Sequence, residues 1–175
     1  MTGEKMSARP LMVKPHMPHP AMPDADWADC YELQVPTADL TAIDVARAML
    51  SRFPPWVRLL MTLRNSVTNV FGLKSTGSNL AGDKGKIGFF PIVSQSDDQV
   101  VLGFDDRHLD FRVVIGVRDD AQGRRLIDTT TLVRRKILLG RIYIALITPF
   151  HRLIVSKMLA NFGKRVNSVS LPASP

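Results

Sequence analysis

The 175-residue sequence predicts one α+β domain in which a curved antiparallel sheet wraps around a long C-terminal helix. Four strand-like segments follow one another between residues 87 and 135, and short polar joins make neighbouring strands antiparallel. One strand and two short helices precede them. Ile137–Phe162 then has the pattern of a single helix, about 39 Å long at 1.5 Å per residue. This order leaves space for an apolar guest between the sheet and the last helix.

The region before the sheet contributes an arm, a strand and a first helix. Residues 1–25 contain five prolines and few large aliphatic residues, so we expect a disordered arm. Cys30–Val35 has the composition of a strand. Thr41 is a suitable N-cap, and Asp44 three residues later resembles the second member of a capping box. The sequence therefore predicts a helix that begins near Thr41 and is broken at Pro54-Pro55.

A second helix is predicted after Pro55, which suits the first turn of a helix. Its apolar residues follow the i, i+3, i+4, i+7 spacing of an amphipathic helix, and Gly72 is a natural end. Residues 74–88 are rich in glycine and are predicted to be a loop. The apolar positions of this helix are Trp56, Leu59, Leu60, Leu63, Val67, Val70 and Phe71.

Four strands follow the loop, which gives five in all. Leu109–Arg118 alternates apolar and polar residues, so one face of the sheet is expected to be buried and the other mostly wet. Thr129 and Thr131 share the inward face of the last strand, where they offer hydroxyl groups to a ligand. The four strands are Ile87–Ser94, Gln99–Asp105, Leu109–Arg118 and Arg124–Arg135.

The C-terminal helix contains Pro149, which removes one backbone donor and is expected to kink it. Ile142–Phe150 is apolar nearly all round, and this pattern is typical of a helix enclosed on several sides. Its most apolar part, Ile142–Ile147, is much shorter than the roughly 20 residues that cross a membrane. We therefore expect one domain over residues 26–163, followed by a flexible tail over 164–175.

Charge and cysteine content limit the class of protein. The formal net charge is +7, which permits contact with anionic membranes or nucleic acid. Only 7% of residues are aromatic and most lie on apolar stripes, so no nucleic-acid partner is expected. The single cysteine, Cys30, forms no intrachain disulfide, and Met1–Pro23 lacks the apolar region of a secretory signal. These features favour a cytoplasmic protein.

Motifs for cofactors are weak. Gly77–Lys84 resembles a phosphate loop, but Asp83 interrupts the required spacing and a helix precedes it instead of a strand. Two histidines without two further ligands make a poor zinc site, so no metal or cofactor is predicted. Three carboxylate pairs lie in strand joins, where Asp side chains stabilise turns. These pairs are Asp97-Asp98, Asp105-Asp106 and Asp119-Asp120.

The densest polar segment is Asp105–Arg112. In a functional interpretation, Asp106, His108 and Arg112 place a general base and an anion-binding fork at the rim of a cavity. In the simpler interpretation, the segment is a solvated hairpin end with weak salt bridges. His151 follows Pro149 and either meets His108 in space or bonds a backbone carbonyl. His108, Arg112 and His151 are thus the polar candidates.

Apolar residues on the inward faces of the strands and of the last helix are the candidates for a ligand cavity. The strand residues would form its floor and the helix residues its lid. Burial of a ligand there would be favourable by roughly 25 cal/mol per Å² of apolar area before association costs. The cavity candidates are Leu102, Phe104, Phe111, Val113, Ile115, Thr129, Thr131, Leu146 and Phe150.

Four segments carry a resemblance: Pro54–Arg58, Phe71–Lys74, Asp105–Arg112 and Gly140–Val155. Through them the chain resembles a family of uncharacterised bacterial proteins. That family is similar to the START-like helix-grip superfamily, which includes plant pollen allergens, lipid-transfer domains and aromatic polyketide cyclases. The resemblance spans about Asp26–Phe162 and implies a hydrophobic cavity for a lipid, polyketide or other apolar molecule. It supplies no catalytic residues, and the five predicted strands are fewer than the seven usual in the superfamily.

The leading functional expectation is non-covalent binding of a small apolar or amphipathic ligand between the sheet and the C-terminal helix. The first alternative is a cyclase- or hydrolase-type enzyme that uses His108 or His151 as its acid–base group. The second is a peripheral membrane protein whose basic Lys157–Arg165 end contacts anionic lipid weakly.

Overall fold

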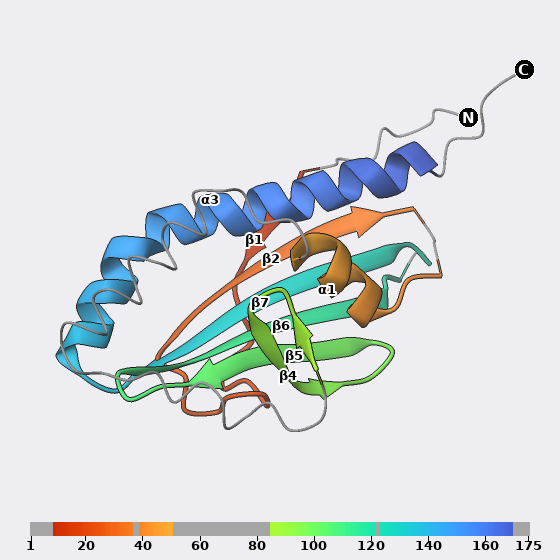
Figure 1. Cartoon of the computed structure of the whole chain (residues 1–175). Helices are drawn as coiled ribbons and strands as arrows, with labels where there is room; N and C mark the ends of the chain where they lie inside the picture. Colours follow the sequence, from red (N-terminus) through yellow and green to blue (C-terminus); the bar gives the residue numbers. More distant parts are fainter. Residues whose placement is uncertain (1–8, 37–38, 51–84, 122, 170–175) are drawn as a thin grey trace, which may run out of the picture.

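The computed structural model describes residues 9–36, 39–50, 85–121 and 123–169, and it is an α+β fold (Figure 1). A long helix and a short helix pack on one face of a seven-stranded sheet. The predicted second helix (residues 55–71) and the phosphate-loop motif (77–84) lie outside the described residues. The strands are β1 (Leu11–Val13), β2 (Trp27–Val35), β3 (Lys86–Ile87), β4 (Phe90–Gln95), β5 (Gln99–Asp105), β6 (Leu109–Asp119) and β7 (Arg125–Arg135), and the helices are α1 (Ala42–Leu50) and α3 (Leu138–Val169).

The sheet is antiparallel throughout, with the strand order β1-β2-β7-β6-β5-β4-β3. Hairpins join β4 to β7 in succession, as the short polar joins predicted. Asp120 accepts a bond from the backbone N–H of Arg124 at 2.9 Å, and the hydroxyl of Ser96 accepts one from Gln99 at 3.2 Å. The polar side chains in these joins therefore stabilise the turns by hydrogen bonds to the backbone. β2 lies beside β7, which places Asp29 directly opposite Thr131.

The structure has two strands more than predicted and an ordered segment where a disordered arm was expected. Residues 11–13 pair with β2 as β1, and Met22 is only 5% exposed. Met22 packs with Val101, Val114 and Leu132 on the back face of the sheet, the face opposite the helices. Alternation along β6 had suggested that this face is mostly wet. Part of it is instead apolar and covered, which explains why the proline-rich segment from residue 9 onward is ordered.

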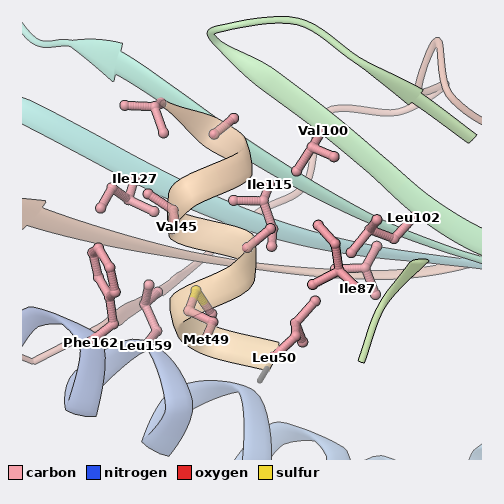
Figure 2. Packing of buried hydrophobic residues seen from close by; sticks show 14 of the residues in the cluster. Val45, Met49, Leu50, Ile87, Val100, Leu102, Ile115, Ile127, Leu159 and Phe162 are labelled. Atoms are coloured by element: carbon pink, nitrogen blue, oxygen red, sulfur yellow. The ribbon is translucent and has the colours of Figure 1, made fainter. Parts of the chain in front are cut away.

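Helix α1 begins as the sequence predicted. The backbone N–H of Asp44 donates to the hydroxyl of Thr41 at 3.3 Å, so Thr41 is the N-cap. The apolar side of α1 packs on the inner face of the sheet, the face that carries both helices. Figure 2 shows Val45, Met49 and Leu50 among side chains of the sheet and of α3. This cluster fills the space around α1, between the sheet and the C-terminal half of α3.

Two glycines set how closely α3 approaches the sheet. A Cβ on Gly140 would lie 2.5 Å from the backbone oxygen of His108, and one on Gly163 would lie 2.7 Å from the side chain of Leu33. Both distances are well below normal van der Waals contact. The helix is therefore held against the sheet near both ends, with Ile144 and Leu159 buried between them.

Helix α3 differs from its prediction in extent and in burial. It continues to Val169, through part of the predicted tail, and it runs through Pro149 as one element. The expectation that it is enclosed on several sides is wrong, because Ile142, Leu146 and Phe150 are 57%, 72% and 50% exposed. By length and composition alone, α3 could cross a membrane, although its most apolar part had been judged too short.

Candidate functional site

A pocket of about 130 Å³ lies between the sheet and the N-terminal half of α3. It occupies the part of the inner face that α1 does not fill. Most of its lining is aromatic or aliphatic, and the polar groups come from Thr131, Thr148, Tyr143 and His151. The lining residues are Trp27, Phe90, Phe104, Leu109, Phe111, Thr131, Val133, Tyr143, Ile144, Ile147, Thr148 and His151.

Three phenylalanines from neighbouring strands form the floor of the pocket. The ring centroid of Phe111 lies 5.6 Å from that of Phe90 and 5.5 Å from that of Phe104. The centroids of Phe90 and Phe104 are 6.5 Å apart, with the two rings nearly parallel. Stacked rings at these distances attract one another in addition to burying apolar area. The floor is therefore a continuous apolar surface.

His151 and Thr131 form a polar end opposite this floor. The Nε2 atom of His151 lies 3.0 Å from the hydroxyl oxygen of Thr131 and 3.3 Å from Oδ1 of Asp29. Asp29 is fully buried, and its Oδ2 has no hydrogen-bond partner among the described residues. The ring of Trp27 meets the imidazole edge-on, with centroids 5.8 Å apart. Strand β2, strand β7 and helix α3 thus meet at one hydrogen-bonded point.

The geometry at His151 limits the chemistry that this point can perform. In a nucleophilic triad, the carboxylate and the hydroxyl bond to different ring nitrogens, so that one nitrogen accepts while the other donates. Here Thr131 and Asp29 both approach Nε2. One nitrogen cannot donate to the carboxylate and accept from the hydroxyl at the same time. The arrangement orients His151 and offers hydrogen bonds, but it does not activate Thr131.

The cavity residues predicted from sequence divide into three groups. Phe104, Phe111 and Thr131 line the pocket. Leu102, Val113, Ile115 and Thr129 are on the same inner face but are buried away from it, the first three in the cluster around α1. Leu146 and Phe150 are not a lid, because both point out from α3 and are largely exposed. The lid is made instead by Tyr143, Ile144, Ile147 and Thr148.

Of the polar candidates, only His151 lines the pocket. His108 is 3% exposed and lies at the hairpin end, with its Nδ1 atom 3.6 Å from Oδ1 of Asp106. Arg112 projects on the back face, where Nη1 donates to the backbone oxygens of Phe104 at 3.1 Å and Phe111 at 2.9 Å. It also pairs with Asp105 at 2.7 Å. These bonds tie the hairpin together. His108 does not line the pocket to which His151 belongs, so the two histidines do not meet.

Sequence reasoning missed the polar partner of His151. The alternation that places apolar side chains on the inner face extends back along β2 to Trp27, where the sequence had predicted the strand only from Cys30. In that register Asp29 takes an inward position between Trp27 and Tyr31. The signal in the sequence was a carboxylate at a position where the alternation otherwise places apolar side chains. Recognising it required the strand to start three residues earlier.

Burial changes the acidity of groups around the site. Burial, and then the charge of Asp29, raise the pKa of the Tyr31 hydroxyl, while Arg152 acts in the opposite direction. On the back face, burial raises the pKa of the Cys30 thiol to about 11, although its hydrogen bond with Thr130 opposes this. The thiol is therefore no nucleophile at neutral pH. Within the described ranges, no three His, Cys, Asp or Glu side chains converge as metal ligands.

Comparisons with known proteins give a family and nothing further. The family described as "Protein of unknown function (DUF2867)" matches residues 21–158. No curated protein and no solved structure matches the chain. The matched range contains strands β2 to β7 but not β1, and it includes every residue that lines the pocket.

Proposed function

The chain belongs to this DUF2867 family, and we propose that it binds a small amphipathic molecule non-covalently in the pocket beneath α3. The observation that carries the proposal is the lining: an apolar floor of three stacked phenylalanines faces a polar end at His151 and Thr131. Sites for small molecules typically combine a mostly apolar wall with a few oriented polar groups.

The fold that we propose is the helix-grip type of the START-like superfamily. Support comes from the order of elements, since a strand and a helix precede a run of hairpins and a long C-terminal helix. The sheet also has seven strands, the usual number in that superfamily, and its inner face carries the helix. The pocket lies in the place where such folds accommodate apolar ligands, which is the fold-level part of the proposal.

The volume restricts the size of the guest. An apolar cavity of about 150 Å³ holds benzene, so a pocket of about 130 Å³ takes a single ring or the end of a longer molecule. A ring that buries roughly 200 Å² gains about 5 kcal/mol, which association costs of at least about 4 kcal/mol nearly cancel. Apolar burial alone therefore gives weak binding. A hydrogen bond to the polar end supplies the remaining affinity, which favours an amphipathic ligand.

p-Cresol and toluene form a matched pair of probes for this proposal. They share a methyl-substituted ring, and only p-cresol carries a hydroxyl that reaches His151 or Thr131. We expect titration followed by ligand-observed NMR to show tighter binding of p-cresol. Thr131→Val, which keeps the side-chain shape, should reduce that preference severalfold. Equal affinity for both probes in the wild type would exclude the polar end from recognition.

Two neighbouring positions on α3 locate the binding. Ile147 lines the pocket, whereas Leu146 is 72% exposed on the other side of the helix. Ile147→Trp fills part of the pocket and should remove p-cresol binding. Leu146→Trp adds the same bulk outside it and should leave binding unchanged. Equal behaviour of the two variants would contradict the proposal.

An acid–base enzyme that acts on the same guest is the second candidate, and the buried partner of His151 is the observation that favours it. A carboxylate that orients an imidazole at the edge of a pocket is a common feature of general bases. Under this candidate, His151→Ala abolishes turnover of a substrate that still binds. Under the binding proposal, the same variant weakens p-cresol binding severalfold and has no turnover to lose. His108 has no part in either, because it lies outside the pocket.

A further inference from the structure

The side of α3 that faces away from the sheet carries a stripe of large apolar residues. The spacing of four, four, four and three residues keeps them on one helix face, about 22 Å long at 1.5 Å per residue. Their side chains are between 48% and 72% exposed. Contiguous apolar surface of this kind marks a site of interaction. The members of this outer stripe are Leu138, Ile142, Leu146, Phe150 and Leu153.

Basic residues of α3 extend the face of the outer stripe toward the C-terminal end of the helix. Lys157 and Lys164 follow Leu153 at intervals of four and seven residues, so they extend the same face, and both are exposed. Helix α3 contains five Lys or Arg residues and no Asp or Glu. None of the five forms an ion pair within the described part of the chain. By contrast, Arg134, Arg135 and Lys136 just before the helix pair with Asp24, Asp26 and Asp110.

We propose that the outer stripe docks on an anionic lipid bilayer, with α3 lying in the plane of the membrane surface. The apolar side chains would enter the boundary between head groups and acyl chains, while Lys157 and Lys164 contact lipid phosphates. Apolar area and cations on one helix are the two contributions to this mode of binding. The proposal does not depend on whether the pocket holds a ligand.

Two other uses of this helix fit the observations less well. A symmetric dimer through the outer stripe would bury Lys157 and Lys164 at an interface where the helix offers no Asp or Glu to pair with them. Crossing the bilayer would remove α3 from the sheet and expose the core, because Ile144, Leu159 and Phe162 of this helix are buried there. Docking on the membrane surface keeps these core contacts and pairs the lysines of α3 with lipid phosphates.

Flotation of the full chain with vesicles tests the proposal. We expect binding to vesicles of phosphatidylcholine with about 30% phosphatidylserine but not to phosphatidylcholine alone, and a loss of binding between about 0.05 M and 0.5 M salt. Leu146→Gln with Phe150→Gln should abolish binding. Lys157→Gln with Lys164→Gln should weaken it by about fivefold per cation. Lys14→Gln with Lys86→Gln removes the same charge elsewhere and serves as the matched control.

Several results would overturn the proposal. One is equal loss of binding in the control variant, which would indicate attraction by net charge alone. Another is bound protein that resists extraction at high pH, which would show insertion across the bilayer. The Leu146→Gln, Phe150→Gln variant should melt within about 2 °C of the wild type, since exposed substitutions alter stability little. A markedly lower melting temperature, or dissociation of a dimer in this variant, would show that protein covers the stripe.

Discussion

The imidazole Nε2 of His151 on α3 lies 3.3 Å from the carboxylate Oδ1 of Asp29 on β2, and this pair links the two walls of the pocket. Asp29 is fully buried, and its Oδ2 has no partner among the described residues. A carboxylate in such a place costs free energy unless its bonds compensate. The position of α3 over the sheet and the polar end of the pocket therefore depend on the same contact.

A double-mutant cycle on Asp29→Ala and His151→Ala should give a coupling energy of about 1–3 kcal/mol in the free energy of unfolding. The reason is that loss of either partner leaves the other poorly bonded in an apolar site. Urea denaturation of the four proteins measures it. Arg152 is the neighbour of His151 but is exposed, so a cycle of Asp29→Ala with Arg152→Ala should give a clearly smaller coupling energy. Equal coupling in both cycles would refute a specific pair.

Gly140→Ala should destabilise the protein by about 1–3 kcal/mol, although alanine normally stabilises a helix relative to glycine. The added Cβ meets the backbone oxygen of His108, which cannot move aside easily. Gly163→Ala should cost less, because its Cβ meets the flexible side chain of Leu33. Thermal unfolding of both variants and of the wild type measures which substitution destabilises the protein more. Stabilisation by Gly140→Ala would show that α3 does not approach the sheet this closely.

Local patterns in the sequence predicted much of the fold, because they are set by neighbouring residues. The alternation of Leu109–Arg118 and the polar joins gave four of the strands to within a few residues, and Thr41 identified the start of α1. The Leu11–Val13 strand was missed for the opposite reason. Three residues among prolines carry no period, and their pairing depends on a distant strand.

The candidate site was predicted less well, because its walls come from segments far apart in the chain. Phe104, Phe111, Thr131 and His151 were found from their own strand or helix. Leu146 and Phe150 were assigned to the wrong side of α3 because a helix that is apolar nearly all round has no period to show which side faces the sheet. Asp29 became recognisable only through its place opposite Thr131.

Native Cys30 should react with iodoacetamide at pH 8 about a hundredfold more slowly than the same cysteine in the urea-unfolded chain. Burial raises its pKa from 9.0 to about 11, which lowers the thiolate fraction by about that factor. Mass spectrometry of the alkylated protein over time gives both rates. Thr130→Val removes the hydrogen bond that opposes the shift and should slow the native reaction further. Similar native and unfolded rates would mean that the thiol is not buried.

Asp128→Asn should gain stability relative to the wild type as the pH rises from 3 to 7. Burial raises the pKa of the Asp128 carboxyl above its ordinary 3.8, and the opposing effect of Arg118 is smaller. The folded protein therefore holds this proton more tightly than the unfolded chain. The resulting stabilisation is complete below pH 3.8 and is lost as the pH rises through the raised pKa. Urea unfolding of both proteins at each pH measures this difference in stability. A loss of stability of Asp128→Asn relative to the wild type as the pH rises would contradict a raised pKa of Asp128.

The most direct test of the proposed function locates p-cresol on the protein. Intermolecular nuclear Overhauser effects would be recorded between the p-cresol ring protons and the methyl groups of the full chain. We expect them at Val133, Ile144 and Ile147, which line the pocket, and not at Leu146 or Leu153 on the outer side of the same helix. Contacts confined to Leu146 and Leu153, or no contacts at a saturating p-cresol concentration, would contradict a binding site beneath α3.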